Sequence, residues 1–238
     1  MELKVIAIAR NGHTDKFGIP RQSREESPII TRIVFEPEYR VPESLRGIEG
    51  YSHLWLLWGF SEGQRNNVQS TKGWSPTVRP PRLGGNKRMG VFATRSPFRP
   101  NPIGLSSVKL VGIENGDLLV SGADVLDGTP IYDIKPYLSF TDCHEEAKNG
   151  FAEETKDYRL EVVWEEETEP DKPAENPLKT PTIPLATKDE ISYILAQDPR
   201  PGYQEDPERE YKMDFAGWTV TFVVKHPRLI VKKVEKMR

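Results

Sequence analysis

A segment of 26 residues, 79–104, concentrates the side chains that could bind an anionic ligand. It reads RPPRLGGNKRMGVFATRSPFRPNPIG and holds six cations, no anion, five prolines and four glycines. Proline fixes φ and glycine lets a ligand approach the backbone, so this loop presents its cations in restricted positions. Little ordering entropy then remains to be lost when an anion binds. A solvated basic loop is the alternative, although the apolar side chains among the charges indicate a loop packed onto a core.

The charge asymmetry extends beyond this segment. Residues 63–113 include nine basic residues and no acidic one, whereas residues 142–171 carry twelve carboxylates. The net charge of −3 therefore conceals a basic half. A phosphate backbone responds to the local field, so the sequence is compatible with a nucleic-acid partner.

Length and composition restrict the class of protein. With 238 residues the chain can form one large domain or two smaller ones. No apolar run approaches the roughly 20 residues that span a membrane, and the first residues lack a signal-peptide pattern. Cys143 is the single cysteine and the four histidines show no ligand spacing, so neither a disulfide nor a metal site is expected. We expect a soluble, cytoplasmic protein.

The first 165 residues are dominated by strand and turn patterns. Short strands are predicted at 3–10, 29–35, 52–60, 90–94, 103–113 and 118–125. The run SHLWLLWGF at 52–60 is almost continuously apolar, which favours a strand buried on both faces, with a buried helix as the alternative. Asn115-Gly116 is the residue pair preferred in a type I′ hairpin turn. Short strands separated by many Pro and Gly turns predict a barrel or a sandwich.

The rest of the chain predicts a smaller unit of different composition. Residues 166–184 are rich in proline and poor in apolar residues, as in a linker. Thr187 and Glu190 match a capping box ahead of a helix that ends at Asp198-Pro199, and strands follow at 218–225 and 229–234. The predicted fold is therefore mainly β, with a β-barrel domain at 1–165 and a small α+β domain at 185–238. No Rossmann or Walker A glycine motif is present.

Two further patterns could carry chemistry. Asp133 and Lys135 lie two residues apart on a predicted strand and so share one face, either as a surface ion pair or in a polar pocket. Arg200 stands between Pro199 and Pro201, either at a helix stop or as a prepositioned anion contact.

Six segments together make the chain recognisable. They are KFGIPRQ (16–22), LRGIEGYSHLW (45–55), TVRPPRLGGN (77–86), GVFATRSPFRPNPIGL (90–105), DGTPIYDIKPYL (127–138) and AQDPRPGY (196–203). In order and spacing the chain resembles the tRNA-methyltransferase O family, also described as TsaA-like or YaeB-like proteins. The resemblance implies an S-adenosylmethionine-dependent β-barrel enzyme that methylates N6 of threonylcarbamoyl-adenosine next to the anticodon of tRNA. It also implies a homodimer with the cofactor bound near the subunit interface.

The resemblance also implies a set of cofactor contacts. These are Pro20, Arg21, Gln22, Ser61, Glu62, Arg95, Leu105, Ser121, Gly122, Ala123 and Asp124. At Ser61 and Glu62 this chain departs from the His-Gln pair of the family pattern. Arg95 suits the carboxylate of the cofactor, and Asp124 or Asp133 suits its sulfonium or amino group.

Substrate and catalytic roles follow from the same resemblance. Lys135, Tyr137 and Arg200 are expected to meet the modified nucleoside, whose threonyl carboxylate needs a cation. Asp133 is the expected general base, with a structural role as the alternative. Contacts to tRNA are expected from Arg79, Arg82, Lys87 and Arg99. Two other kinds of protein remain open: a non-catalytic tRNA-binding module and a sensor that binds the cofactor without transferring methyl.

Overall fold

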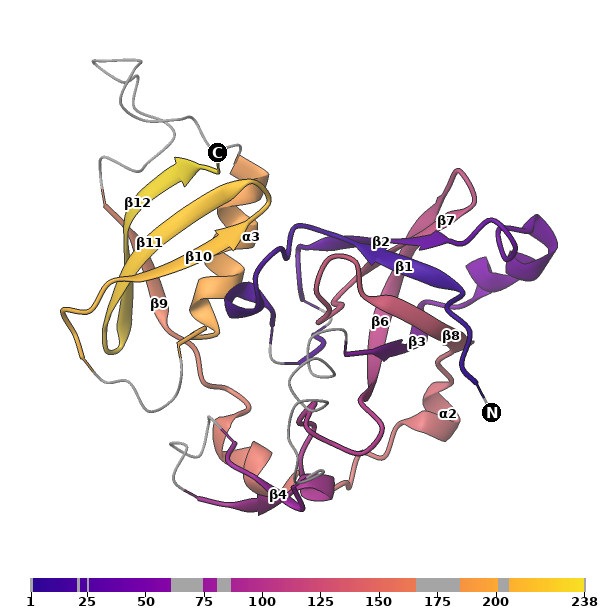
Figure 1. Ribbon diagram of the computed structural model, residues 1–238, viewed down its shortest axis with the longest axis horizontal. Helices are drawn as coiled ribbons and strands as arrows, with labels where there is room; N and C mark the ends of the chain where they lie inside the picture. Colours follow the sequence, from indigo (N-terminus) through magenta and orange to yellow (C-terminus); the bar gives the residue numbers. More distant parts are fainter. Residues whose placement is uncertain are drawn as a thin grey trace.

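The computed structural model contains two bodies of β structure joined through the chain between them (Figure 1). It describes residues 2–20, 22–24, 26–60, 75–80, 87–165, 185–200 and 206–237. The predicted linker, 166–184, lies outside these ranges. The architecture is mainly β, as predicted, and each body has its own hydrophobic core.

Six antiparallel strands form the N-terminal body. They are β1 Ala7–Arg10, β2 Ile30–Phe35, β3 His53–Gly59, β6 Ile103–Glu114, β7 Asp117–Ser121 and β8 Pro130–Pro136. They pair in the order β1-β2-β7-β6-β3-β8, and β8 pairs back with β1, so that the sheet closes into a barrel. Closure leaves no unpaired edge among these six strands.

Strand β3 corrects one sequence-based prediction. Its side chains alternate: Leu54, Leu56 and Trp58 are buried in the barrel core, whereas those between them are half-buried. The strand is therefore buried on one face, not on both. A closed barrel has a single core, so only every second residue of a strand can enter it.

The β6–β7 hairpin confirms the predicted turn. Asn115 and Gly116 have φ angles of 53° and 80°, the left-handed pair that a type I′ turn requires. Strand β7 ends at Ser121, earlier than predicted, where Gly122 adopts φ 85° and turns the chain out of the sheet. The predicted strand 3–10 is likewise shorter, because only its second half pairs as β1.

The basic segment folds differently from its predicted strand at 90–94. Strand β4, Thr77–Val78, pairs with β5, Met89–Gly90, and a 3-10 helix, Val91–Ala93, follows. The Val91 side chain is fully buried and its N–H donates to the Pro76 carbonyl at 2.9 Å. Burial of this one valine turns the chain away from the two-stranded sheet.

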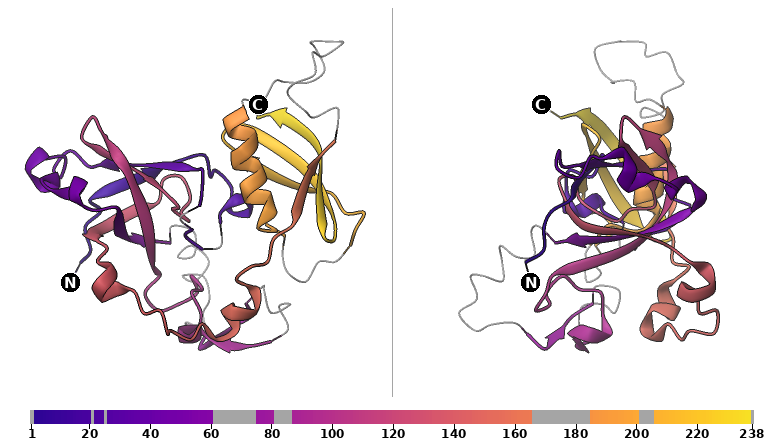
Figure 2. Two further views of the ribbon diagram at one scale, coloured as in Figure 1. Left: turned by 180° about the vertical axis from the view of Figure 1, so that it is seen from behind. Right: turned by 90° about the vertical axis from the view of Figure 1, so that its right-hand side faces the viewer.

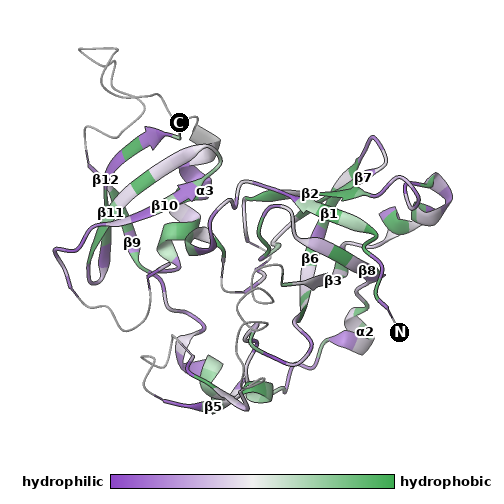
Figure 3. Ribbon diagram, in the orientation of Figure 1, coloured by the Kyte–Doolittle hydropathy of each residue, from purple (hydrophilic) through white to green (hydrophobic). Residues whose placement is uncertain are grey.

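The C-terminal body is a four-stranded sheet with one helix. The strands are β9 Glu161–Trp164, β10 Tyr211–Phe215, β11 Trp218–Lys225 and β12 Arg228–Lys236, in the order β10-β11-β12-β9. Strand β9 runs parallel to β12 and so belongs to the C-terminal sheet. It lies before residue 165, the predicted end of the first domain. Helix α3, Leu185–Ala196, covers one face of this sheet (Figure 2). The sheet has hydrophobic and hydrophilic stretches (Figure 3), and five consecutive residues of β11, 220–224, are buried.

The predicted core residues of helix α3 are confirmed, whereas its predicted start is wrong. Ile191, Ile194 and Leu195 are buried in the C-terminal core. Thr187 lies inside the helix rather than at its N-cap, so the capping-box prediction is wrong. The buried residues all follow Thr187, so the apolar spacing located the helix but not its first turn.

Short helices connect these elements, and the segment after β1 joins the two bodies. The short helices are η1 Lys16–Gly18, η2 Pro42–Leu45, η3 Ile48–Gly50, α2 Ser139–Asp142 and η6 Gly150–Thr155. The His13 ring lies 5.2 Å from that of Phe215, and the Ala216 N–H donates to the Gly12 carbonyl at 2.9 Å. None of the helices that the structure describes is long and apolar enough to cross a membrane.

Candidate functional site

A chain of polar side chains lies at the end of the barrel where β3 ends and β6 begins. The Trp58 Nε1–H donates to the Ser106 Oγ at 2.8 Å, and the Ser106 hydroxyl donates to Asp124. Burial raises the pKa of the Asp124 carboxyl, while hydrogen bonding from Ser106 and the nearby charge of Arg95 oppose that rise. A cation bound beside Asp124 would favour its ionised form.

Arg95 approaches the same point from the basic segment. Its Nη1 donates to the Gln22 Oε1 at 2.6 Å, which joins two segments 73 residues apart. The Arg95 side chain remains exposed. The site therefore combines an accessible guanidinium, suited to a carboxylate, with a half-buried carboxylate, suited to a cation.

Gly122 holds the loop at residues 22–24 against the end of β7. Its φ of 85° is left-handed, and a Cβ there would lie 2.6 Å from the Arg24 carbonyl oxygen. Only glycine permits this approach. The neighbouring Ser121 and Ala123 are buried, and so is Pro20. These three predicted cofactor contacts therefore lie in the interior, next to the loop and the turn that form the site.

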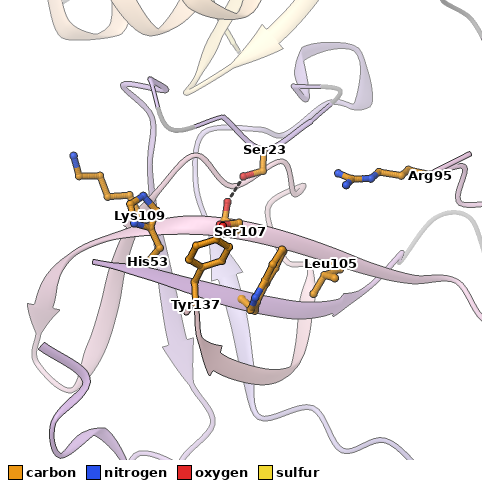
Figure 4. A pocket seen from close by; sticks show the side chains of 8 residues that line it. Ser23, His53, Arg95, Leu105, Ser107, Lys109 and Tyr137 are labelled. Atoms are coloured by element: carbon orange, nitrogen blue, oxygen red, sulfur yellow. Dashed lines mark hydrogen bonds between the residues drawn. The ribbon is translucent and has the colours of Figure 1, made fainter. Parts of the chain in front are cut away.

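A pocket of about 350 Å³ opens beside Arg95 on the outer face of β3 and β6 (Figure 4). It is lined by Ser23, His53, Trp55, Arg95, Leu105, Ser107, Lys109 and Tyr137. The strand register builds it, because His53 pairs with Lys109, and Trp55 with Ser107. The Ser23 hydroxyl donates to the Ser107 carbonyl and closes one side. Its size is within the range of small-ligand sites.

Aromatic rings form the floor of this pocket. The Trp55 Nε1–H donates to the Asp142 Oδ2 at 2.8 Å, and the Trp55 ring lies 5.4 Å from that of Tyr137. The hydrogen bond from the Leu138 backbone, followed by that from Trp55, lowers the pKa of Asp142. Desolvation, with the neighbouring Cys143 and Asp142, raises the pKa of Tyr137. Tyr137 is therefore a neutral hydrogen-bond donor at neutral pH.

Sequence reasoning missed five lining residues: Ser23, His53, Trp55, Ser107 and Lys109. A signal for two of them was present, because strict alternation along 52–60 places His53 and Trp55 on one strand face. The interpretation of that run as buried on both faces concealed it.

The three predicted catalytic residues are not equally placed. Tyr137 lines the pocket. The Lys135 Nζ lies 2.8 Å from the Asp133 Oδ2, and both side chains are substantially exposed. They therefore form a surface ion pair, the first of the two arrangements that the sequence left open. On β8, Lys135 is paired with Trp55 of β3 and Asp133 with Leu57.

The predicted cationic contacts are dispersed. Arg79 and Lys87 are exposed on the β4–β5 segment, and Arg99 is half-buried. In the C-terminal body, the Arg200 Nε and Nη2 donate to Asp198 at 2.8 and 2.9 Å. Four predicted residues lie outside the described ranges: Arg21, Ser61, Glu62 and Arg82.

Side chains of the kinds that bind metals are scattered over the molecule. Within the described ranges, no three His, Cys, Asp or Glu side chains gather so that they could hold a metal ion. Cys143 is free and exposed.

Comparison with known proteins identifies relatives along the whole chain. A protein named tRNA (adenine(37)-N6)-methyltransferase from Eikenella corrodens is 43% identical over 187 residues, covering 77% of this chain and 97% of that protein. The protein of that name from Escherichia coli is 36% identical over 94% of this chain and 92% of its own length. A Pseudomonas aeruginosa relative, 38% identical over 94% of this chain and 93% of its own length, is provisionally named an S-adenosylmethionine-dependent methyltransferase.

Solved structures and family models agree with these relatives. A crystal structure of TrmO from Pseudomonas aeruginosa superposes with a TM-score of 0.74 at 31% identity, covering 99% of this chain and 97% of that one. The family model of the tRNA-methyltransferase O N-terminal domain matches residues 8–143, and that of the TrmO C-terminal domain matches residues 157–237. The chain therefore belongs to the tRNA-methyltransferase O family.

Proposed function

We propose that this protein is an S-adenosylmethionine-dependent tRNA methyltransferase that acts on N6 of adenine 37, present as threonylcarbamoyl-adenosine next to the anticodon. Membership of the family and the names of the relatives support the reaction. The observation that carries the proposal is the meeting of Gln22, Arg95 and Asp124 at one end of the barrel. A tRNA substrate favours a cytoplasmic location.

The side chains at this end of the barrel fit the cofactor. Arg95 would bind its carboxylate and Asp124 would neutralise its ammonium or sulfonium charge, while Leu105 offers an exposed apolar surface. When bound, the cofactor supplies an electrophilic methyl group. Gln22 holds the Arg95 guanidinium in place, so that less side-chain entropy is lost on binding.

The protein must also remove a proton from the nucleophile. The N6 nitrogen of this nucleoside is urea-like, so loss of its proton must accompany or precede methyl transfer. We assign Asp133 as the general base and Lys135 as the cation that orients it. Tyr137, whose raised pKa keeps its hydroxyl protonated, would donate a hydrogen bond to the substrate.

Contacts to the tRNA would come from two regions. Arg79, Arg82, Lys87 and Arg99 would bind backbone phosphates, which position a nucleic acid without choosing a base. Arg200 would read the threonyl carboxylate. Asp198 holds its side chain in one orientation, with only 12% of that side chain exposed.

We also propose a homodimer, in which the apolar run at 54–60 does not supply the interface. Leu54, Leu56 and Trp58 fill the core of their own barrel and are not available to a partner. The hairpin end of β6, beyond the pocket, is the better candidate, with Val111 52% and Ile113 36% exposed. Sedimentation at micromolar concentration should give twice the monomer mass of 27.1 kDa, and Val111→Lys should restore the monomer mass. A wild-type mass near 27.1 kDa would refute the dimer.

One experiment tests the proposed reaction against its alternatives. The protein is incubated with tRNA and methyl-labelled S-adenosylmethionine, and the tRNA is digested to nucleosides. Label in threonylcarbamoyl-adenosine supports the enzyme. Binding of tRNA without label would indicate a non-catalytic module, and cofactor binding that ignores tRNA would indicate a sensor.

A further inference from the structure

Apart from Tyr137, half of the pocket has no role in the function proposed so far. Figure 4 shows Arg95 and Leu105 at one end and His53 and Lys109 at the other. The proposed cofactor contacts use only the Arg95 end. Five of the six remaining lining residues lie on the strands or directly after them and are named the aromatic strip: His53, Trp55, Ser107, Lys109 and Tyr137.

The rings of the aromatic strip are held in fixed positions. Trp55 is half-buried, and its indole is tethered by the 2.8 Å hydrogen bond to Asp142. Tyr137 lies between its two neighbours, with ring centroids 5.4 Å from Trp55 and 6.2 Å from His53. Because these rings are already ordered, a flat ligand that stacks on them would cost little side-chain entropy.

The charge around the strip is positive. Lys109 is exposed opposite His53 and forms no ion pair with any residue that the structure describes. Arg95 stands at the other end of the same pocket. The nearest carboxylate to Trp55, Asp142, already accepts hydrogen bonds from Trp55 and from the Leu138 backbone.

We propose that the aromatic strip is a base-stacking subsite, in which Trp55 stacks on an unpaired RNA base and Lys109 contacts the adjoining phosphate. Fixed aromatic rings flanked by cations are the means by which proteins bind single-stranded RNA. The strip shares a pocket with the Arg95 end, where the cofactor that supplies the methyl group is proposed to bind. The stacked base is therefore a loop nucleotide neighbouring the one that is methylated. This inference rests on the proposed function in taking tRNA as the ligand.

The test measures binding of synthetic RNA hairpins whose unpaired loop has the sequence of a tRNA anticodon loop. Trp55→Leu removes the ring, and it should weaken binding of the intact hairpin about tenfold. Trp55→Phe keeps a ring but loses the bond to Asp142, and it should retain most of the affinity. Tyr51→Leu, at an exposed aromatic residue outside the pocket, is the matched control and should bind as the wild type does.

A second set of hairpins, each lacking one loop base, identifies the partner of Trp55. Wild type and Trp55→Leu should bind equally to the hairpin that lacks the stacked base and differ on the others. An equal loss on every hairpin, unchanged RNA affinity, or weaker binding of S-adenosylmethionine instead would overturn the proposal. Should Trp55→Leu fail to fold, Lys109→Ala tests the same strip, since it should weaken RNA binding and reduce its salt dependence.

Failure of this inference can be told from failure of the proposed reaction. The hairpin measurements require no methyl transfer. A wild type that stacks an RNA base on Trp55 but transfers no label would refute the proposed reaction and leave the subsite standing. Methyl transfer that is unaffected by Trp55→Leu, with unchanged RNA affinity, would refute only the subsite.

Discussion

Arg95 and Asp124 influence each other at the residue scale. The Arg95 charge opposes the effect of burial on the pKa of Asp124, and so favours the ionised carboxylate. Such a pair is a suitable receptor for a zwitterionic amino-acid moiety, because each member can meet the opposite charge. Neither residue is close to the other in sequence, and Gln22 is the link that brings Arg95 into position.

Removal of Arg95 should therefore affect the cofactor first. Arg95→Ala should weaken S-adenosylmethionine binding by about 2 kcal/mol, the value of a charge-assisted bond to a carboxylate. Titration calorimetry on the folded variant measures this loss. Arg88→Ala, at an exposed arginine that donates to Thr77 at 2.8 Å, is the control. Unchanged cofactor affinity in Arg95→Ala would exclude Arg95 from the site.

The element that decides the site is the turn after β7. Gly122 and Gly47 have nearly the same left-handed φ, 85° and 86°, but only Gly122 has another backbone against it. Gly122→Ala should displace the loop at 22–24 and weaken cofactor binding at least tenfold. Gly47→Ala should cost only the backbone strain of about 1 kcal/mol. Thermal unfolding measures the loss of stability, and titration calorimetry measures the loss of cofactor affinity. An equal loss of cofactor affinity in the two variants would contradict this account.

The β4–β5 segment is the element proposed to bind the tRNA backbone. Neutralising Arg79, Arg82 and Lys87 together should weaken tRNA binding and flatten its salt dependence, by about 0.7 to 0.9 in log–log slope for each phosphate that is no longer bound. Cofactor affinity should not change. Neutralising Lys4 and Lys212, which are exposed elsewhere, provides the control. An unaltered salt slope in the triple variant would place the tRNA on another surface.

At the scale of the whole molecule, the two bodies meet around a buried histidine. His13 is fully buried against Phe215 of the C-terminal sheet. Burial lowers its pKa from 6.5 to about 4, with the Gly18 backbone partly opposing that change. The junction is therefore built for a neutral imidazole, and a proton on His13 would place an uncompensated charge between the bodies.

Acid should consequently weaken this junction. Between pH 6.5 and about 4 the unfolded state binds the proton more readily than the folded state, so the free energy of unfolding falls as the pH falls. The His13 contribution is fully present above that range, and its loss amounts to about 3 kcal/mol at the acid end. Chemical unfolding across this range should show a shallower pH dependence for His13→Leu, whereas His144→Gln, at an exposed position, should follow the wild type. If the free energy of unfolding of His13→Leu and of the wild type fell equally with pH, His13 would not be the group responsible.

The sequence by itself determined the features that depend on neighbouring residues. Asn115-Gly116 specified its turn because left-handed φ angles are a local property, and the apolar run 218–225 became β11 with the predicted bounds. Six short segments together, the motif at 90–105 among them, indicated the family. Membership of that family, in turn, directed attention to Gln22, Arg95 and Asp124 as one site.

Tertiary structure alone decided which side chains meet. Alternation along β3 left two choices for which face enters the core, and barrel closure selected Leu54, Leu56 and Trp58. The same closure turned Trp55 outward, opposite Ser107, and so created the pocket. Thr187 carried a capping signal, yet it lies inside α3. Local patterns fix dihedral angles over a few residues, whereas contacts across a closed sheet depend on the path of the whole chain, which no short pattern encodes.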